Sequence, residues 1–125
     1  MTIRFDQTEH DKLLLVALNK LKEDGFSEIK AECVDYEKPA PLYAKEIKNS
    51  YSPDITAKKK EQEYIIEVET KDSIFTEVTE KQWKTFSENA DYYNKKFVII
   101  IREDLKNEAE RQSNYLNVNP EIWTV

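Results

Sequence analysis

The 125-residue chain is poor in the residues on which several common functional sites depend, with one glycine, one cysteine and one histidine. A single glycine argues against the loops that hold phosphates in Rossmann and Walker proteins, because those loops need several glycines. Cys33 has no partner for an internal disulfide, and Cys33 with His10 is too small a set to hold structural zinc. A nucleophilic triad is disfavoured as well, because His10 would have to serve alone.

Long apolar runs are also missing. No stretch approaches the roughly 20 apolar residues that a helix needs to cross a bilayer. The start of the chain, residues 1–6, lacks the apolar core of a signal peptide. We therefore expect a cytoplasmic protein that makes no membrane contact.

The size and composition of the chain predict a folded globule. At 125 residues, of which 39% are hydrophobic and 11% aromatic, the chain is long enough to bury a core as one domain, residues 1–125. Its formal net charge of −6 disfavours nucleic acid as a partner, because phosphate binding depends mainly on lysine and arginine. Carboxylates that hold a metal would add to this acidity, so the charge alone does not exclude such a partner.

Three segments have the periodicity of helices. Apolar residues at helical spacing predict a well-buried first helix over residues 7–24. A stripe of aromatic and small residues predicts a second helix over residues 79–93, with Thr79 and Gln82 as its capping box. A third helix, rich in exposed charge, is expected over residues 104–116.

Five further segments have the pattern of strands: residues 28–33, 53–57, 64–70, 97–101 and 121–125. The run 97–101 is apolar without interruption, which is typical of a central parallel strand buried on both faces. Residues 42–48 are expected to form a short helix. The remaining order, αβββαβαβ, predicts an α/β protein with a single mixed β-sheet flanked by helices.

One hairpin is predicted where two β-rich runs flank a very polar connector, residues 58–63. If the turn is centred on this connector, antiparallel pairing places Asp54 opposite Glu67 and Ser52 opposite Glu69. Directly opposed side chains have Cβ atoms about 5 Å apart, and like charges placed in this way repel. A divalent cation between the two carboxylates would convert the repulsion into binding.

Two interpretations fit the second strand of this hairpin, on which Glu67, Glu69 and Lys71 share one face. The first is an amphipathic strand with a solvated polar face, which is common in antiparallel sheets. The second is a metal site in which Asp54 and Glu67 supply hard oxygen ligands, with Glu69 beside them. Magnesium takes one or two carboxylates together with waters and substrate phosphate oxygens. The pattern alone leaves both interpretations open.

The pair Pro53-Asp54, followed by an apolar strand with Glu67-Val68-Glu69, resembles the motif of the PD-(D/E)xK nuclease superfamily, which has the restriction-endonuclease-like fold. That motif consists of Asp, a short gap, Asp or Glu, any residue, and Lys. The predicted element order is similar to the αβββαβ core of the family. The resemblance covers residues 7–102.

This resemblance implies a Mg²⁺- or Mn²⁺-dependent nuclease that hydrolyses phosphodiester bonds of nucleic acid, with DNA as the expected substrate. Asp54 and Glu67 would be metal ligands, and Glu69, in the position of the motif lysine, would join the metal shell or orient the attacking water. Lys71 would stabilise the transition state. The missing lysine leaves a second hypothesis, a catalytically degenerate module of the same fold that binds a protein or nucleic-acid partner. No separate DNA-recognition domain is visible, so catalysis would need a homodimer or a larger complex.

The same resemblance implies accessory residues, each of which has a structural alternative. Glu9 is a candidate acidic residue on the first helix, or it favours the helix dipole. Gln82 is similar to a glutamine found on the corresponding helix of some family members, or it serves the capping box. Lys84 is a candidate for a displaced catalytic cation, or it is an ordinary solvated side chain.

Overall fold

The computed structural model describes residues 7–45 and 47–125, and the side chains of residues 8–45 and 50–125. Over this part of the chain the helices are α1 (Gln7–Glu23), α2 (Glu77–Tyr93) and α3 (Lys106–Leu116), with a 3₁₀ turn at Glu103–Leu105. The strands are β1 (Ser27–Ala31), β2 (Leu42–Ala44), β3 (Ile47–Tyr51), β4 (Ile55–Lys59), β5 (Gln62–Val68), β6 (Lys96–Ile101) and β7 (Glu121–Thr124). None of the helices in the described residues has both the length and the apolar character needed to cross a membrane.

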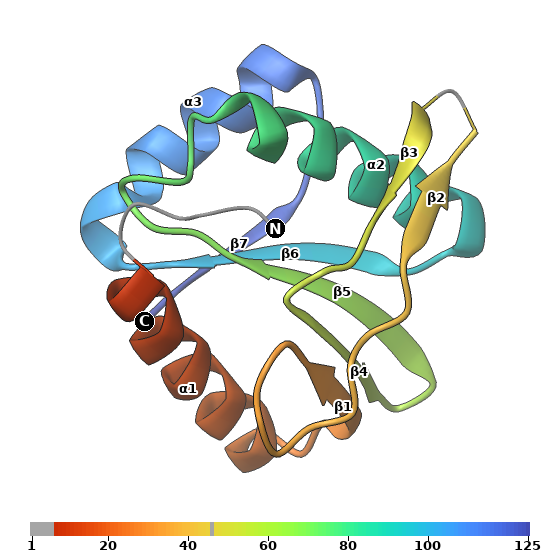
Figure 1. Ribbon diagram of the computed structural model, residues 1–125, viewed down its shortest axis with the longest axis vertical. Helices are drawn as coiled ribbons and strands as arrows, with labels where there is room; N and C mark the ends of the chain where they lie inside the picture. Colours follow the sequence, from red (N-terminus) through yellow and green to blue (C-terminus); the bar gives the residue numbers. More distant parts are fainter. Residues whose placement is uncertain (1–6, 46) are drawn as a thin grey trace.

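Within the described ranges, five strands form one mixed sheet in the order β1-β4-β5-β6-β7 (Figure 1). β4 runs antiparallel to both β1 and β5. β6 runs parallel to both β5 and β7, as its uninterrupted apolar sequence predicts, and is buried from Phe97 onward. The predicted α/β class, with a mixed sheet flanked by helices, is confirmed. β2 and β3 pair separately as a hairpin outside this sheet.

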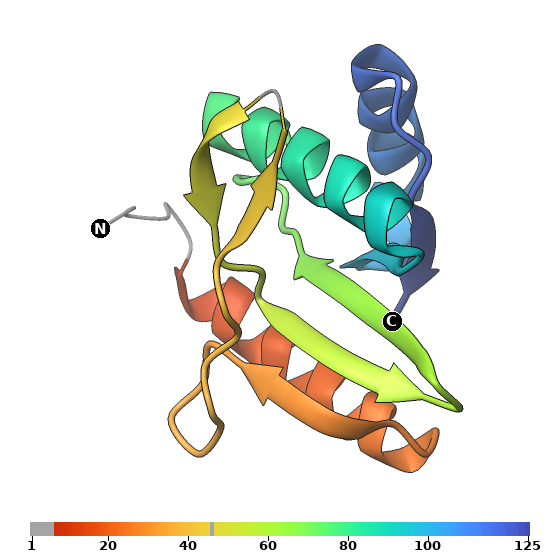
Figure 2. The same ribbon diagram turned by 90° about the vertical axis from the view of Figure 1, so that its right-hand side faces the viewer.

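Helices cover both faces of the sheet (Figure 2). α1 packs on one face, where Leu18 and Ile66 belong to the same buried cluster. α2 and α3 cover the other face, where Trp83 and Ile65 belong to a second cluster. Because successive strand residues point to opposite faces, neighbouring residues of β5 contribute to different cores.

The predicted pairing of the β4–β5 hairpin is confirmed. Ile55 pairs with Ile66 and Lys59 with Gln62, so the turn consists of Lys60 and Glu61. These two residues have φ angles of 49° and 68°. Two left-handed residues in succession are characteristic of the tight turns whose twist matches that of the flanking strands. The backbone of this turn is therefore ordinary for a hairpin, although its residues are not the usual Asn and Gly.

The short helix predicted over residues 42–48 is wrong, because β2 and β3 occupy this segment. Contacts with α2 explain the difference. Asn89 Nδ2 donates to the Tyr43 carbonyl at 3.0 Å, and the Lys45 backbone N–H donates to Glu88 Oε1 at 3.1 Å. These bonds hold β2 in an extended conformation against α2, and such tertiary contacts override weak local helix propensity.

The predicted capping box of the second helix is also wrong. α2 begins at Glu77, and its N-cap is Thr76, whose Oγ1 accepts a hydrogen bond from the Thr79 backbone N–H at 3.2 Å. Thr79 is therefore already inside the first turn, where its hydroxyl donates to the Ser73 carbonyl at 2.7 Å. The cap lies three residues earlier than predicted because the bend that precedes α2 is stabilised by contacts with Ser73.

Candidate functional site

Asp54 and Glu67 lie side by side at one end of the β4–β5 hairpin, as the predicted register requires. The Asp54 backbone N–H donates to Glu67 Oε1 at 3.1 Å. The Val68 backbone N–H in turn donates to Asp54 Oδ2 at 2.9 Å. Each carboxylate is thus oriented by a backbone group of the opposite strand. The predicted pairing of Ser52 with Glu69 is not part of the ladder, which ends at Ile55 and Ile66 because β4 begins only at Ile55.

The acidic side chains of this region are removed from solvent. Asp54 is 5% exposed, and Glu67 and Glu69 are each 1% exposed. The interpretation of β5 as an amphipathic strand with a solvated polar face is therefore wrong. Burying carboxylates is costly unless hydrogen bonds or opposite charges compensate them, so three such groups at one end of a central strand need an explanation.

Glu69 is held by two side-chain donors. Ser73 Oγ donates to Glu69 Oε1 at 2.6 Å, and Trp83 Nε1 donates to Glu69 Oε2 at 2.9 Å. Trp83 lies fully buried on α2, and Ser73 lies in the bend between β5 and α2. Glu69 thereby joins the end of β5 to α2, and coordination of a metal by Glu69 would have to displace one of these donors.

His10 was not among the predicted site residues, yet the structure brings it to the acidic pair. It lies on α1, is 4% exposed, and has Nε2 3.3 Å from Asp54 Oδ2. Its Nδ1 lies 3.5 Å from Asp11 Oδ1. One signal was present in the sequence: His10 precedes Leu14 and Ala17 at helical spacing, so it belongs to the buried stripe of α1.

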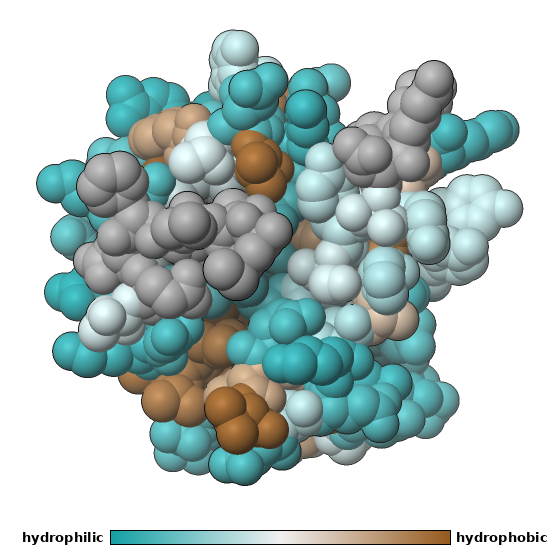
Figure 3. Space-filling model, in the orientation of Figure 1, coloured by the Kyte–Doolittle hydropathy of each residue, from teal (hydrophilic) through white to brown (hydrophobic). Residues whose placement is uncertain are grey.

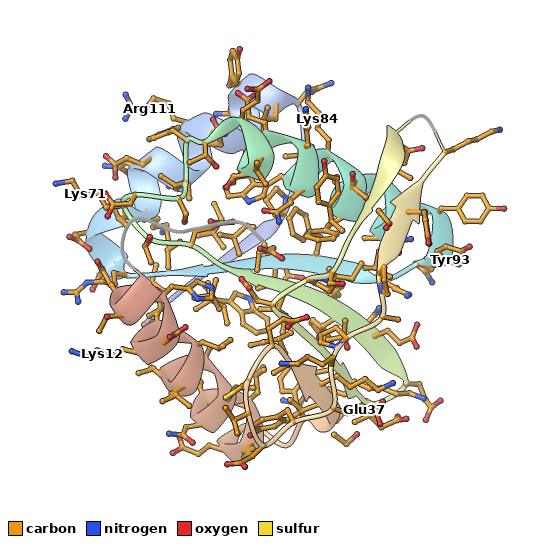
Figure 4. All side chains as sticks on the ribbon, viewed as in Figure 1. Lys12, Glu37, Lys71, Lys84, Tyr93 and Arg111 are labelled. Atoms are coloured by element: carbon orange, nitrogen blue, oxygen red, sulfur yellow. The ribbon has the colours of Figure 1, made fainter. Side chains whose placement is uncertain are left out.

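Lys71 does not follow the predicted arrangement. β5 ends at Val68, and the chain turns from Lys71 onward, so strand alternation no longer relates Lys71 to Glu67. Its side chain is exposed and points away from the sheet (Figure 4). The bend that redirects the chain is stabilised by Ser73, whose Oγ accepts from the Thr70 backbone N–H at 2.9 Å.

The three accessory candidates lie on the two helices that flank the sheet. Glu9 is half-buried on α1, next to His10 in the chain. Gln82 is half-buried on α2. Lys84 is exposed on α2 and points outward (Figure 4). Of the three, Glu9 is the one that adjoins a residue in contact with Asp54.

The chemistry of Asp54 and Glu67 suits a hard divalent cation, because both supply carboxylate oxygens. Across the described residues, no group of three or more His, Cys, Asp or Glu side chains is arranged to hold a metal ion. A cation at this position would therefore depend on two carboxylates, with waters or phosphate oxygens in the remaining positions. Magnesium sites commonly have this composition.

A hollow of about 210 Å³ lies over the antiparallel strands, lined in part by Lys30, Lys58 and Lys95. The three ammonium groups are each paired with a carboxylate: Lys30 with Glu37 at 2.9 Å, Lys58 with Glu28 at 3.7 Å, and Lys95 with Glu63 at 3.9 Å. The paired charges largely cancel. This hollow therefore offers little net attraction for a polyanion.

Comparison with known proteins identifies the fold but no family. No family model matches the chain, and no curated protein sequence matches it. Its fold is similar to that of a crystal structure described as a protein of unknown function, AF1548, with a TM-score of 0.55 and 15% sequence identity. The match covers 89% of this chain and 55% of that one, so this chain spans about half the length of that protein. At this level of identity the likeness concerns the fold alone.

Proposed function

We propose that this chain is a metal-dependent nuclease that hydrolyses phosphodiester bonds of nucleic acid, with DNA as the expected substrate. The observation that carries the proposal is the burial of Asp54 and Glu67 side by side, each oriented by a backbone N–H of the other's strand. Stability gives no reason for this pair, because apolar residues of similar volume would fill the space without the cost of desolvating two carboxylates.

In this proposal Asp54 and Glu67 hold Mg²⁺ or Mn²⁺ at the end of the hairpin. When bound, the ion supplies a water of lowered pKa and neutralises charge that develops on the phosphate. His10, whose Nε2 lies 3.3 Å from Asp54 Oδ2, keeps that carboxylate in place from α1. The chain's own contribution is thus to orient two oxygen donors before the substrate arrives.

Glu69 and Lys71 have different roles in this proposal. Glu69 fixes the end of β5 to α2 through Ser73 and Trp83, so it positions the acidic pair. Lys71 projects from the bend that follows β5 and is suited to contact with a phosphate of the nucleic-acid backbone.

The second candidate is a catalytically degenerate module of the same fold that binds a protein or nucleic-acid partner, as a homodimer or within a larger complex. One observation favours it. Glu69 occupies the position of the lysine in the nuclease motif that this chain resembles, and both of its carboxylate oxygens accept hydrogen bonds from buried donors. A group held in this way is suited to holding structure together more than to activating a water.

A cleavage assay tests the nuclease. Plasmid and branched DNA are incubated with Mg²⁺ or Mn²⁺ and the wild type, Asp54→Ala or Glu61→Gln. Glu61 is the matched control, since it is an acidic residue of the β4–β5 turn with a side chain 93% exposed. We expect cleavage by the wild type and the control and none by Asp54→Ala. Equal activity of the wild type and Asp54→Ala would overturn the site.

A metal titration separates the two candidates. Millimolar Mn²⁺ should raise the Tm of the wild type, because a ligand that binds the folded state stabilises it by RT ln(1 + [L]/Kd). Asp54→Ala should show no such rise. A wild type that does not respond to Mn²⁺ favours the non-catalytic module.

A further inference from the structure

A pocket of about 320 Å³ lies between β2 and the C-terminal half of α2. Tyrosine dominates its wall, since Tyr43 comes from β2 and Tyr92 and Tyr93 come from the end of α2. We call it the tyrosine pocket. Figure 4 labels Tyr93 at the edge of the molecule beside β2, at the opposite end of the view from Lys71. The right-hand edge of the same view in Figure 3 is mostly pale teal to teal, so the surface there is weakly to strongly hydrophilic.

The three tyrosines present much of their surface to solvent. Tyr43 is 64% exposed, Tyr92 78% and Tyr93 60%. The rings of Tyr92 and Tyr93 are 4.8 Å apart between centroids and inclined by 75°. Two ring faces at such an angle form a corner against which a flat molecule can stack. Tyrosine rings left exposed in this way are typical of binding surfaces, where one end is apolar and the other is wet.

Asn89 adds a polar group to the same wall. It is 5% exposed, and its Nδ2 donates to the Tyr43 carbonyl at 3.0 Å, which identifies the other end of the amide as the oxygen. Among the described residues nothing donates a hydrogen bond to this buried Oδ1. Buried amide oxygens nearly always have a donor, so the pocket has a place for a ligand that carries an N–H group.

One lysine belongs to the pocket. Lys45 lies in the wall with an exposed side chain. Lys95 has its Nζ 5.4 Å from the centre of the Tyr93 ring, but it lies outside this wall and is paired with Glu63. Glu88 is also in the wall, where its carboxylate already accepts the backbone N–H of Lys45. The pocket therefore combines stacking surfaces, one acceptor for an N–H donor and one lysine in its wall.

We propose that the tyrosine pocket binds an unpaired nucleobase, an inference that rests on the proposed function because it takes nucleic acid as the partner. A nucleobase is a flat ring that carries N–H donors and is linked through a sugar to phosphates. These features match the ring faces, the Asn89 oxygen and Lys45 in turn. Stacking of bases on aromatic side chains tolerates any sequence, because every base has a π face.

The test measures binding without cleavage. Fluorescence anisotropy in EDTA, with Asp54→Ala as the parent protein, compares a labelled single-stranded oligonucleotide with one of equal length in which the bases are replaced by abasic sites. Both carry the same phosphates, so a difference in affinity reports the bases. We expect the parent to prefer the oligonucleotide with bases, and Tyr92→Ala to weaken its binding by about 5- to 100-fold.

Two control variants make this result specific. Tyr92→Phe keeps a π face and should bind as the parent does. Tyr115→Ala removes a tyrosine that is 75% exposed on α3, outside the pocket, and should also bind as the parent does. If Tyr92→Ala binds as tightly as the parent, or if the abasic oligonucleotide binds equally well, the nucleobase pocket is overturned.

The two proposals are tested separately. Asp54→Ala tests the nuclease proposal in the cleavage assay, and Tyr92→Ala tests the nucleobase proposal in the binding assay, where no cleavage occurs. A protein contact is a further outcome. If sedimentation shows a dimer that Tyr92→Ala dissociates, while oligonucleotide binding is unchanged, the pocket is an interface between copies of the chain and the nucleobase proposal fails.

Discussion

The two faces of β5 differ in the way they are buried. On the face toward α1, Ile66 and Val68 are both 0% exposed and belong to an apolar cluster. On the face toward α2, Ile65 is followed at the same parity by Glu67 and Glu69, which are equally buried. Toward α1 this segment thus presents apolar side chains alone, whereas toward α2 the apolar Ile65 is followed by two carboxylates, Glu67 and, just after the strand ends, Glu69.

This difference separates what the fold needs from what a site needs. The apolar face stabilises the protein simply by leaving water, at roughly 25 cal/mol for each Å² of apolar surface. The acidic face must instead find a donor for each group that it buries, and the donors come from the backbone of Asp54 and from Ser73 and Trp83. Such an arrangement is kept at a cost in stability, and this cost is the basis of the proposed metal site.

The apolar face should show the largest effect on stability. Ile66→Ala is expected to lower the free energy of unfolding by about 2–5 kcal/mol, because it removes buried methyl groups and leaves a cavity. Chemical denaturation measures the change. Leu15→Ala is the control, since Leu15 lies on α1 but is 53% exposed. A similar loss in both variants would contradict the assignment of Ile66 to the core.

The Glu69 contacts should give the next largest effect. Glu69→Ala leaves Trp83 Nε1 without its acceptor, which costs about 1–3 kcal/mol, whereas Ser73 Oγ retains the Thr70 carbonyl as an acceptor. Trp83→Phe removes the same Trp83–Glu69 bond from the other side. A double-mutant cycle should therefore show coupling of about 0.5–3 kcal/mol between the two residues.

Trp123→Phe is the matched control for that cycle, because the Trp123 Nε1 bonds an exposed Glu121 carboxylate at 3.3 Å. It should show no coupling to Glu69. Additive effects of Glu69→Ala and Trp83→Phe would show that the bond contributes nothing measurable.

Substitution of Glu67 should not destabilise the protein, because in the proposal the burial of Glu67 serves the metal site and not the fold. Glu67→Gln keeps an oxygen that can accept the Asp54 backbone N–H and removes a buried charge. We expect the free energy of unfolding to stay the same or to rise by about 1 kcal/mol, while the rise in Tm with Mn²⁺ disappears. A large loss of stability with Mn²⁺ binding intact would make Glu67 a structural residue like Glu69.

The exposed ion pair between Lys30 of β1 and Glu37 should have the smallest effect on stability. The Glu37 carboxylate hydrogen-bonds the Lys30 ammonium and raises the pKa of Lys30 above its ordinary value of 10.5. A raised pKa of Lys30 means that the ion pair stabilises the folded state at pH values below 10.5. This contribution to stability is lost as the pH rises through the raised pKa. The Tm of Glu37→Gln should therefore differ from that of the wild type only below this alkaline range. The difference should be very small, because solvent screens exposed ion pairs. A clear shift in Tm at neutral pH would contradict this.

Local patterns in the sequence were sufficient for most of the fold. The predicted helices 7–24, 79–93 and 104–116 all correspond to observed helices. The hairpin register could be predicted from the symmetry of the polar connector, and it places Asp54 beside Glu67. Periodicity records which residues share a face, and a register follows once the turn is located.

Contacts between distant segments could not be predicted in this way. The β2–β3 hairpin depends on bonds to Asn89 and Glu88, more than 40 residues along the chain. The partners of Glu69 come from the bend before α2 and from α2 itself, and His10 reaches Asp54 from α1. Nothing in the spacing of these residues specifies which side chains meet, because their approach is set by the packing of helices on the sheet.

The turn at Lys60 and Glu61 makes the acidic pair sensitive to insertions and deletions at a distance. Asp54 lies six residues before the turn, or roughly 20 Å along an extended strand. One added or deleted residue would slip the pairing by one position and rotate the side chains of one strand to the other face, so that Asp54 and Glu67 would part. Substitution of the turn residues leaves the count unchanged, and Asn-Gly suits their left-handed backbone well. The connector is therefore free to vary in composition but not in length.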